Sequence, residues 1–168
     1  GGSFTMPDND VTLTATWSAP ILYGITYVMN GGTNAAQNPT TYTVTSGLIT
    51  LADPTRAGYT FLGWTATDNI PAGSTGARTF TATWSAPIAY AVNYVMNGGT
   101  NSAQNPATYT VVSPTITLAD PARAGYTFLG WTPTDTIATG STGARTFTAT
   151  WSAPIAYDIT YVMNGGTN

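Results

Sequence analysis

The sequence predicts an all-β or β-dominated protein built from tandem repeats of about 67 residues arranged as an extended array. Tryptophan recurs at this spacing, as Trp17, Trp84 and Trp151. Residues 24–90 align with residues 91–157 without a gap, and 54 of the 67 positions are identical. Self-similarity at a fixed period is typical of repeat architectures. Thr contributes 35 of the 168 residues, whereas Glu and Lys are absent. This composition favours strands over helices.

The phase of the repeat divides the chain into four parts. Residues 11–20 read VTLTATWSAP and align with RTFTATWSAP at residues 78–87, so we interpret residues 1–19 as the end of a preceding repeat. Two repeat units follow, at residues 20–86 and 87–153. Residues 154–168 then read as the beginning of a following repeat.

Local patterns predict the strands of the first unit. The predicted strands cover residues 25–29, 41–45, 48–51, 59–65 and 78–84. The first is followed by Asn30-Gly31-Gly32, a strong turn signal, and the third is stopped by Asp53-Pro54. The last alternates most regularly, with Phe80, Ala82 and Trp84 on one face and Thr on the other. Half-buried strands with an outer face of Thr would explain the composition.

Large aromatic side chains are the predicted core. A unit of about 67 residues needs large side chains to fill its interior. The alternative is a flat aromatic platform for sugar rings. The predicted core aromatics are Trp17, Trp64, Trp84, Trp131, Trp151, Phe61, Phe80, Phe128 and Phe147.

The segment Ser85–Ala89 is predicted to be a short, fairly stiff connector. Pro87 fixes its own φ and lacks an N–H donor, and apolar residues accompany it. We therefore expect neighbouring repeats to touch. The candidates for this inter-repeat contact are Pro20, Tyr23, Pro87, Ile88, Tyr90, Pro154, Ile155 and Tyr157.

Two charged pairs recur at turns, Asp53 with Arg56 and Asp120 with Arg123. A ligand-facing pair is one interpretation. We favour a structural one, in which the Asp caps a turn begun by Pro and the Arg folds back onto it or across to the sheet.

Two further segments resemble ligand-binding loops only in part. Pro7-Asp8-Asn9-Asp10 alternates oxygen ligands but lacks the Gly and the terminal acid of a calcium loop, so a solvated hairpin turn is favoured. Gly73-Ser74-Thr75-Gly76 and its copy at residues 140–143 have neither the Lys nor the helix of a phosphate loop. We predict hairpin turns there.

The composition excludes several kinds of chemistry. Without His, Cys or Lys, the usual zinc sites, thiol or His-based catalysis and Schiff-base formation are not available. We expect no cofactor, no metal and no enzymatic activity. A net charge of −3 with four scattered Arg makes nucleic acid a poor partner. No apolar stretch approaches the roughly 20 residues of a membrane span.

Several segments together resemble the Listeria–Bacteroides repeat family, which is related to the B-repeats of internalins. They are ITYVMNGGTN, NPTTYTV, ITLADPTRAGYTFLGW and GSTGARTFTATW in the first unit, and their copies in the second. The resemblance covers essentially the whole chain. It implies small β-grasp-like domains strung along large secreted or cell-surface bacterial proteins, and it supplies no catalytic residues.

The leading functional hypothesis is a structural stalk, spacer or fibre-forming segment of an extracellular or cell-surface protein, such as an adhesin. Its partners would be neighbouring repeats and, in a fibre, other copies of itself. One alternative is a multivalent module that binds host or matrix glycans or a host protein. Another is a filament or sheath subunit that assembles by strand addition at the half-repeats.

Overall fold

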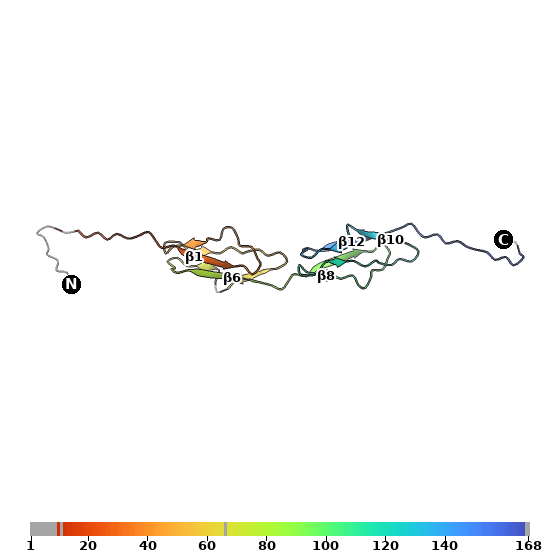
Figure 1. The fold of residues 1–168 in the computed structure, drawn as a ribbon, viewed down its shortest axis with the longest axis horizontal. Helices are drawn as coiled ribbons and strands as arrows, with labels where there is room; N and C mark the ends of the chain where they lie inside the picture. Colours follow the sequence, from red (N-terminus) through yellow and green to blue (C-terminus); the bar gives the residue numbers. More distant parts are fainter. Residues whose placement is uncertain (1–9, 11, 66, 167–168) are drawn as a thin grey trace.

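The computed structural model describes residues 10, 12–65 and 67–166. These residues form β-strands and no helix, in two units that lie end to end along the long axis of the molecule (Figure 1). The segments before the first unit and after the second run outward to opposite ends. The predicted fold class, a β-dominated array of small repeats, is confirmed. We call residues 23–84 the first repeat and residues 90–151 the second.

Each repeat contains six strands in the same order. The first repeat has β1 (Tyr23–Val28), β2 (Thr41–Tyr42), β3 (Ile49–Thr50), β4 (Phe61–Trp64), β5 (Asn69–Ile70) and β6 (Arg78–Trp84). The second has β7 (Tyr90–Val95), β8 (Thr108–Tyr109), β9 (Ile116–Thr117), β10 (Phe128–Thr132), β11 (Thr136–Ile137) and β12 (Arg145–Trp151).

The main sheet of the first repeat has the order β2-β1-β6-β4. The first and last strands of the repeat lie side by side at its centre and run parallel, with Ile25 opposite Arg78 and Val28 opposite Thr81. Both edge pairings are antiparallel. The second repeat has the same arrangement, β8-β7-β12-β10. The central pair is parallel in both repeats.

A second, two-stranded ladder joins β3 to β5 in the first repeat and β9 to β11 in the second. The strand Asn69–Ile70 was not among the predicted strands, because it is two residues long and contains one apolar residue. Ile70 nevertheless is almost fully buried and packs with Leu51 into the same cluster as the main sheet. The ladder therefore completes the core of the repeat.

One core lies inside each repeat. In the first it consists of Ile25, Tyr42, Leu51, Trp64, Ile70, Phe80 and Ala82, and in the second of Val92, Tyr109, Leu118, Trp131, Ile137, Phe147 and Ala149. Phe61 and Trp84, like Phe128 and Trp151, are partly buried and pack against these clusters. Burying a large apolar side chain stabilises a fold by about 1.5–3 kcal/mol. Each repeat thus contains its own source of stability.

Trp17 does not lie in a core, contrary to the sequence prediction, because its side chain is 91% exposed. Its counterpart Trp84 packs against Phe61 and donates a hydrogen bond to the carbonyl of Met29. No described residue gives Trp17 the contacts that Phe61 and Met29 give to Trp84, so its strand-like sequence does not bury it.

The Gly73–Gly76 segment is not a hairpin turn, which corrects the sequence prediction. Its first two residues belong to a turn over residues 71–74, which is closed by a hydrogen bond from Ser74 N to Pro71 O, 3.2 Å long. The flanking strands β5 and β6 belong to different sheets and do not pair with each other. The segment therefore carries the chain from the small ladder to the main sheet. Of the Pro7–Asp10 segment, only Asp10, which is exposed, falls within the described residues.

Candidate interaction site: the junction between the repeats

The upstream side of the junction is a turn made by Arg56, Ala57, Gly58 and Tyr59. Tyr59 N donates to Arg56 O at 3.2 Å, and Gly58 has a φ of +77°. A positive φ at the third residue is the requirement of a type II turn, which is why glycine stands there. The second repeat has the same turn, with Gly125 at a φ of +76°.

The connector between the repeats is hydrogen-bonded to this turn. Ile88 N donates to Gly58 O at 2.8 Å, and Ser85 N donates to Thr60 O at 2.9 Å. The hydroxyl of Ser85 in turn accepts a hydrogen bond from Thr60 N at 3.0 Å. The same bonds recur after the second repeat, including Ile155 N to Gly125 O at 2.8 Å. The upstream repeat therefore fixes the direction in which the connector leaves.

The downstream repeat contacts the same turn through Val111. A Cβ added at Gly58 would lie 2.6 Å from the Cβ of Val111, so the backbone of Gly58 and this side chain are packed against each other. At Gly125, a Cβ would meet no atom within 4 Å. Gly58 is buried and Gly125 is only half-buried. Likewise Val111 is half-buried, whereas its counterpart Val44 is 43% exposed.

Val111 lies in a turn, although the sequence predicted a strand through its counterpart Val44. Ser113 N donates to Thr110 O at 3.0 Å, and Thr110 N donates to the hydroxyl of Ser113 at 3.0 Å. The turn presents an apolar side chain at one end of the repeat. An apolar residue between two turn-forming hydroxyl residues was the only sequence signal of this contact.

The Val111 turn makes hydrogen bonds that the Val44 turn lacks. The hydroxyl of Thr139 donates to Ser113 O at 2.9 Å, and Thr139 N donates to the hydroxyl of Thr115 at 3.3 Å. Gly140 N also donates to Val111 O at 3.1 Å. The positions of Thr115 and Thr139 hold Leu48 and Ala72 in the first repeat. Thr115 and Thr139, which differ from the residues of the first repeat, thus add hydrogen bonds that stabilise the Val111 turn at the junction.

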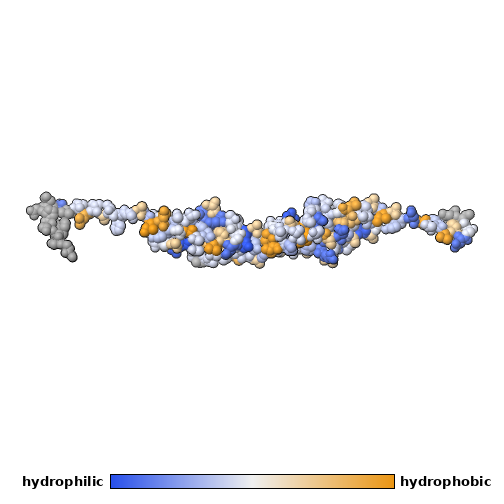
Figure 2. All heavy atoms as spheres, viewed as in Figure 1, coloured by the Kyte–Doolittle hydropathy of each residue, from blue (hydrophilic) through white to orange (hydrophobic). Residues whose placement is uncertain are grey.

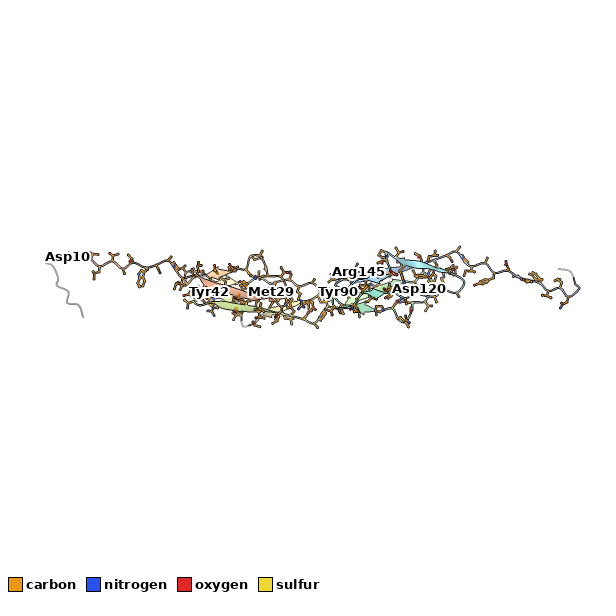
Figure 3. All side chains as sticks on the ribbon, viewed as in Figure 1. Asp10, Met29, Tyr42, Tyr90, Asp120 and Arg145 are labelled. Carbon is orange, nitrogen blue, oxygen red and sulfur yellow. The ribbon has the colours of Figure 1, made fainter. Side chains whose placement is uncertain are left out.

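The residues proposed from sequence for the inter-repeat contact are found in three environments. Pro87 and Ile88 are half-buried at the junction, whereas their copies Pro20, Pro154 and Ile155 are exposed. Tyr23 and Tyr90 pack on Tyr42 and Tyr109 of their own repeats, with ring centroids 5.5 Å and 5.7 Å apart. Figure 3 shows Tyr90 between the two repeats, at the beginning of β7. Tyr157 is 75% exposed.

Arg56 does not pair with Asp53, which corrects one form of the sequence prediction. Its guanidinium carbon lies 3.7 Å from the centroid of the Tyr59 ring, and a Cβ added at Gly31 would lie 3.4 Å from the same guanidinium group. Arg123 lies over Tyr126 in the same way, at 3.6 Å. The described residues contain no ion pair between either Asp and its Arg. The guanidinium of Arg56 stacks on the face of the Tyr59 ring, three residues along the chain. The carboxylate of Asp53 is exposed and therefore hydrated, so it competes poorly for this cation.

Each repeat contains a buried tyrosine that was not among the predicted core residues, Tyr42 in β2 and Tyr109 in β8. Tyr42 is 3% exposed, donates its hydroxyl proton to Gly76 O and accepts a hydrogen bond from Arg78 Nε at 3.3 Å. Tyr109 has the same partners in the second repeat, Gly143 O and Arg145 Nε. Tyr27 donates to Pro39 O at 2.8 Å, and burial raises the pKa of its phenol.

The rest of the described surface offers no concave site. No pocket and no group of three or more metal-ligating side chains is present in the described ranges. The part of the chain that the structure describes has no helix of the length and apolarity needed to cross a bilayer. Figure 2 shows a surface that is mostly near neutral in hydropathy, with small scattered apolar and polar areas. The junction is therefore the best-defined interaction site of the described residues.

Comparison with known proteins relates the chain to one domain family and to one solved structure. The model of the Listeria-Bacteroides repeat domain matches residues 23–83 and 90–151. Curated protein sequences give no match. Among solved structures, domains 3–4 of the Streptococcal High Identity Repeats in Tandem (SHIRT) from a cell surface protein align with 77% of this chain and 96% of theirs, at 14% identity and a TM-score of 0.28. Since the family model matches well over half of the chain, the protein belongs to the Listeria-Bacteroides repeat domain family and contains two copies of that repeat.

Proposed function

We propose that this chain is a segment of a stalk, a non-catalytic spacer that holds another part of a bacterial surface or secreted protein at a distance. Two units of the same fold lie end to end, each with its own core. Such units extend a protein by a fixed length per repeat. The chain has no His, Cys, Lys or Glu, and this composition supports a structural role over a catalytic one.

The observation that carries this proposal is the way in which the repeats are joined. The connector is hydrogen-bonded to the upstream repeat through Ile88, and Val111 of the downstream repeat packs on the same turn at Gly58. Two contacts on one short segment restrict bending in more than one direction. A flexible linker would be rich in Gly and Ser and would lack such contacts. The junction therefore supports a stiff spacer over repeats that are joined by flexible linkers.

The proposed location is outside the cell. The family resemblance implies secreted or surface proteins, and the composition agrees with exposure to proteases. The chain contains four Arg and no Lys, so a trypsin-like protease would find few cleavage sites. Two of these arginines, Arg56 and Arg123, are held against tyrosine rings.

Small-angle X-ray scattering on this chain and on a chain lengthened by one further repeat tests the proposal. A stalk predicts an elongated particle whose maximum dimension grows by a constant increment for the added repeat. A strand of about eight residues spans roughly 26 Å, so the increment is expected to be a few nanometres. A compact particle, or a maximum dimension that does not grow, would refute the stalk.

Two alanine substitutions isolate the contribution of the junction. Gly58→Ala and Gly125→Ala place the same strain on the same type of turn, because both glycines have a φ near +77°. Only the first adds a Cβ that collides with the following repeat. We expect Gly58→Ala to broaden the distribution of interatomic distances in solution, and Gly125→Ala to leave it unchanged. Equal distributions for the two variants would show that the Gly58–Val111 contact does not set the shape.

A further inference from the structure

The central pair of each repeat joins its first strand to its last. In the first repeat, four residue pairs link β1 to β6, from Ile25 with Arg78 to Val28 with Thr81. The strands β7 and β12 are joined in the same register in the second repeat. Both strands of a pair lie along the long axis of the molecule (Figure 1). Because they are parallel, the chain enters a repeat at one end of the pair and leaves it at the other.

Side-chain hydrogen bonds continue the contact between β1 and β6 beyond the ladder. The chain turns away from β6 after Val28. At this point Nδ2 of Asn30 donates to Ala82 O at 3.0 Å, and Nε1 of Trp84 donates to Met29 O at 2.9 Å. The second repeat has both bonds at 2.9 Å, from Asn97 and Trp151. The last strand is therefore bonded to the first along nearly its whole length.

The central pair is also covered by its surroundings. The strands β2 and β4 lie on its outer sides, so neither β1 nor β6 is an edge strand. The ring of Tyr27 stacks on that of Phe80, its partner in the register, with centroids 6.2 Å apart. Phe80 and Ala82 are buried. Hydrogen bonds covered in this way are less accessible to water, which competes for each of them.

A pull along the chain loads the central pair in shear. The force enters at the beginning of β1 and leaves at the end of β6, so it drives the two parallel strands past each other in opposite directions. All the hydrogen bonds between them then share the load and must break nearly together. In an antiparallel pair joined by a tight hairpin the two free ends lie side by side, and the same pull would open the bonds one after another.

We propose that each repeat is a load-bearing unit, in which the central pair resists tension along the chain. This inference rests on the proposed stalk, because a spacer transmits any pull on the part that it holds away from the surface. A repeat that unfolded under a small force would lengthen the spacer, since residues 23–84 extend to as much as roughly 220 Å. The shear-loaded pair keeps the length of the spacer fixed under load.

Single-molecule force spectroscopy on the first repeat, within the full chain, tests the proposal with two pulling directions. The chain contains no Cys, so introduced Cys pairs define the points of attachment. Gly24→Cys with Ala86→Cys loads the central pair in shear. Gly24→Cys with Ala77→Cys pulls the beginnings of β1 and β6 apart, because residues 24 and 77 precede the first pair of the ladder. All three positions are exposed.

We expect the unfolding force at one loading rate to be at least roughly twofold higher in shear, because the other direction breaks the bonds one at a time. Equal forces would overturn the proposal. The force is measured within one repeat, so the result is independent of the shape of the whole chain. Equal forces beside an elongated particle in scattering would therefore remove the load-bearing role and leave the stalk.

Two further substitutions locate the resistance within the repeat. Asn30→Gly removes the bond to Ala82 O and suits the φ of 48° at this position. Asn38→Ala removes two bonds to Ala52, and neither of these residues lies in the central pair. Both variants should be less stable in urea, but only Asn30→Gly should lower the force in shear. An equal fall in both variants would tie the force to overall stability and overturn the assignment to the central pair.

Discussion

The indole ring of Trp84 lies directly on Gly32, so that a Cβ at residue 32 would overlap the ring. Trp84 Nε1 also donates to Met29 O at 2.9 Å. The end of the last strand is thereby closed onto the turn that follows the first strand. Trp151, Gly99 and Met96 form the same arrangement in the second repeat.

Replacing Gly32 by Ala should therefore destabilise the first repeat. Inserting a methyl group into a packed contact typically costs about 1–3 kcal/mol. Urea denaturation followed by tryptophan fluorescence measures the loss as a lower midpoint. Gly24→Ala is the matched control, since residue 24 is unobstructed and its counterpart in the second repeat is already Ala91. An unchanged midpoint for Gly32→Ala would contradict the packing described for Trp84.

Because Arg56 stacks on Tyr59 and does not pair with Asp53, substitutions of Arg56 and of Asp53 should change the free energy of unfolding by different amounts. Arg56→Gln removes the cation and should reduce the free energy of unfolding by about 0.5–1 kcal/mol. Asp53→Asn should change it by less than about 0.5 kcal/mol, as is usual for exposed sites. Chemical denaturation of both variants measures the two changes in the free energy of unfolding. Equal losses would indicate that Asp53 and Arg56 interact after all.

The half-buried phenols of Tyr27 and Tyr94 predict a loss of stability in alkali. Burial raises their pKa above the ordinary value of 10.0 in the folded state. Their contribution is therefore fully present below pH 10 and is lost as the pH rises through the folded pKa. Tyr27→Phe combined with Tyr94→Phe should flatten the fall in stability above pH 10, measured by thermal unfolding between pH 8 and pH 12. An identical fall in the parent and in the variant would rule out these two groups as its cause.

The exposure of Trp17 predicts which tryptophan a quencher reaches. With a side chain 91% exposed, it should account for most of the fluorescence that acrylamide quenches, because Trp64 and Trp131 are buried. Trp17→Phe should remove this accessible fraction. Phe61→Leu, a change within the first repeat, provides a comparison in which Trp17 stays accessible. Undiminished quenching in Trp17→Phe would mean that another tryptophan is open to solvent.

Strong local patterns made part of this fold predictable. The alternation from Arg78 to Trp84 predicted β6 with its observed bounds, because a central strand with one buried face has a period of two residues. The strand β5 could not be predicted from the sequence, because two residues are too few to show an alternating pattern. Their pairing with β3 is set by the tertiary fold. Asp53 and Arg56 suggested a charged pair through proximity in sequence, although the Tyr59 ring was a competitor at a similar distance along the chain.

The junction was predictable only in outline. Pro87 and the apolar residues beside it indicated a stiff connector and touching neighbours. They did not indicate that Gly58 and Val111 would meet, because that contact depends on the relative orientation of two folded units. Gly125 and Val44, the equivalents of Gly58 and Val111, lie at the outer ends of the two described repeats, so the contact between complete repeats is seen once, at Gly58 and Val111.

Residual dipolar couplings of backbone amides, measured on the whole chain in a weakly aligning medium, test the stiff junction most directly. If Ile88 and Val111 hold the repeats in one orientation, a single alignment tensor will fit the couplings of residues 23–84 and 90–151 together. If the repeats move independently, each will require its own tensor, with different magnitudes and axes. The first result is the one that a stiff spacer predicts, and the second would contradict it.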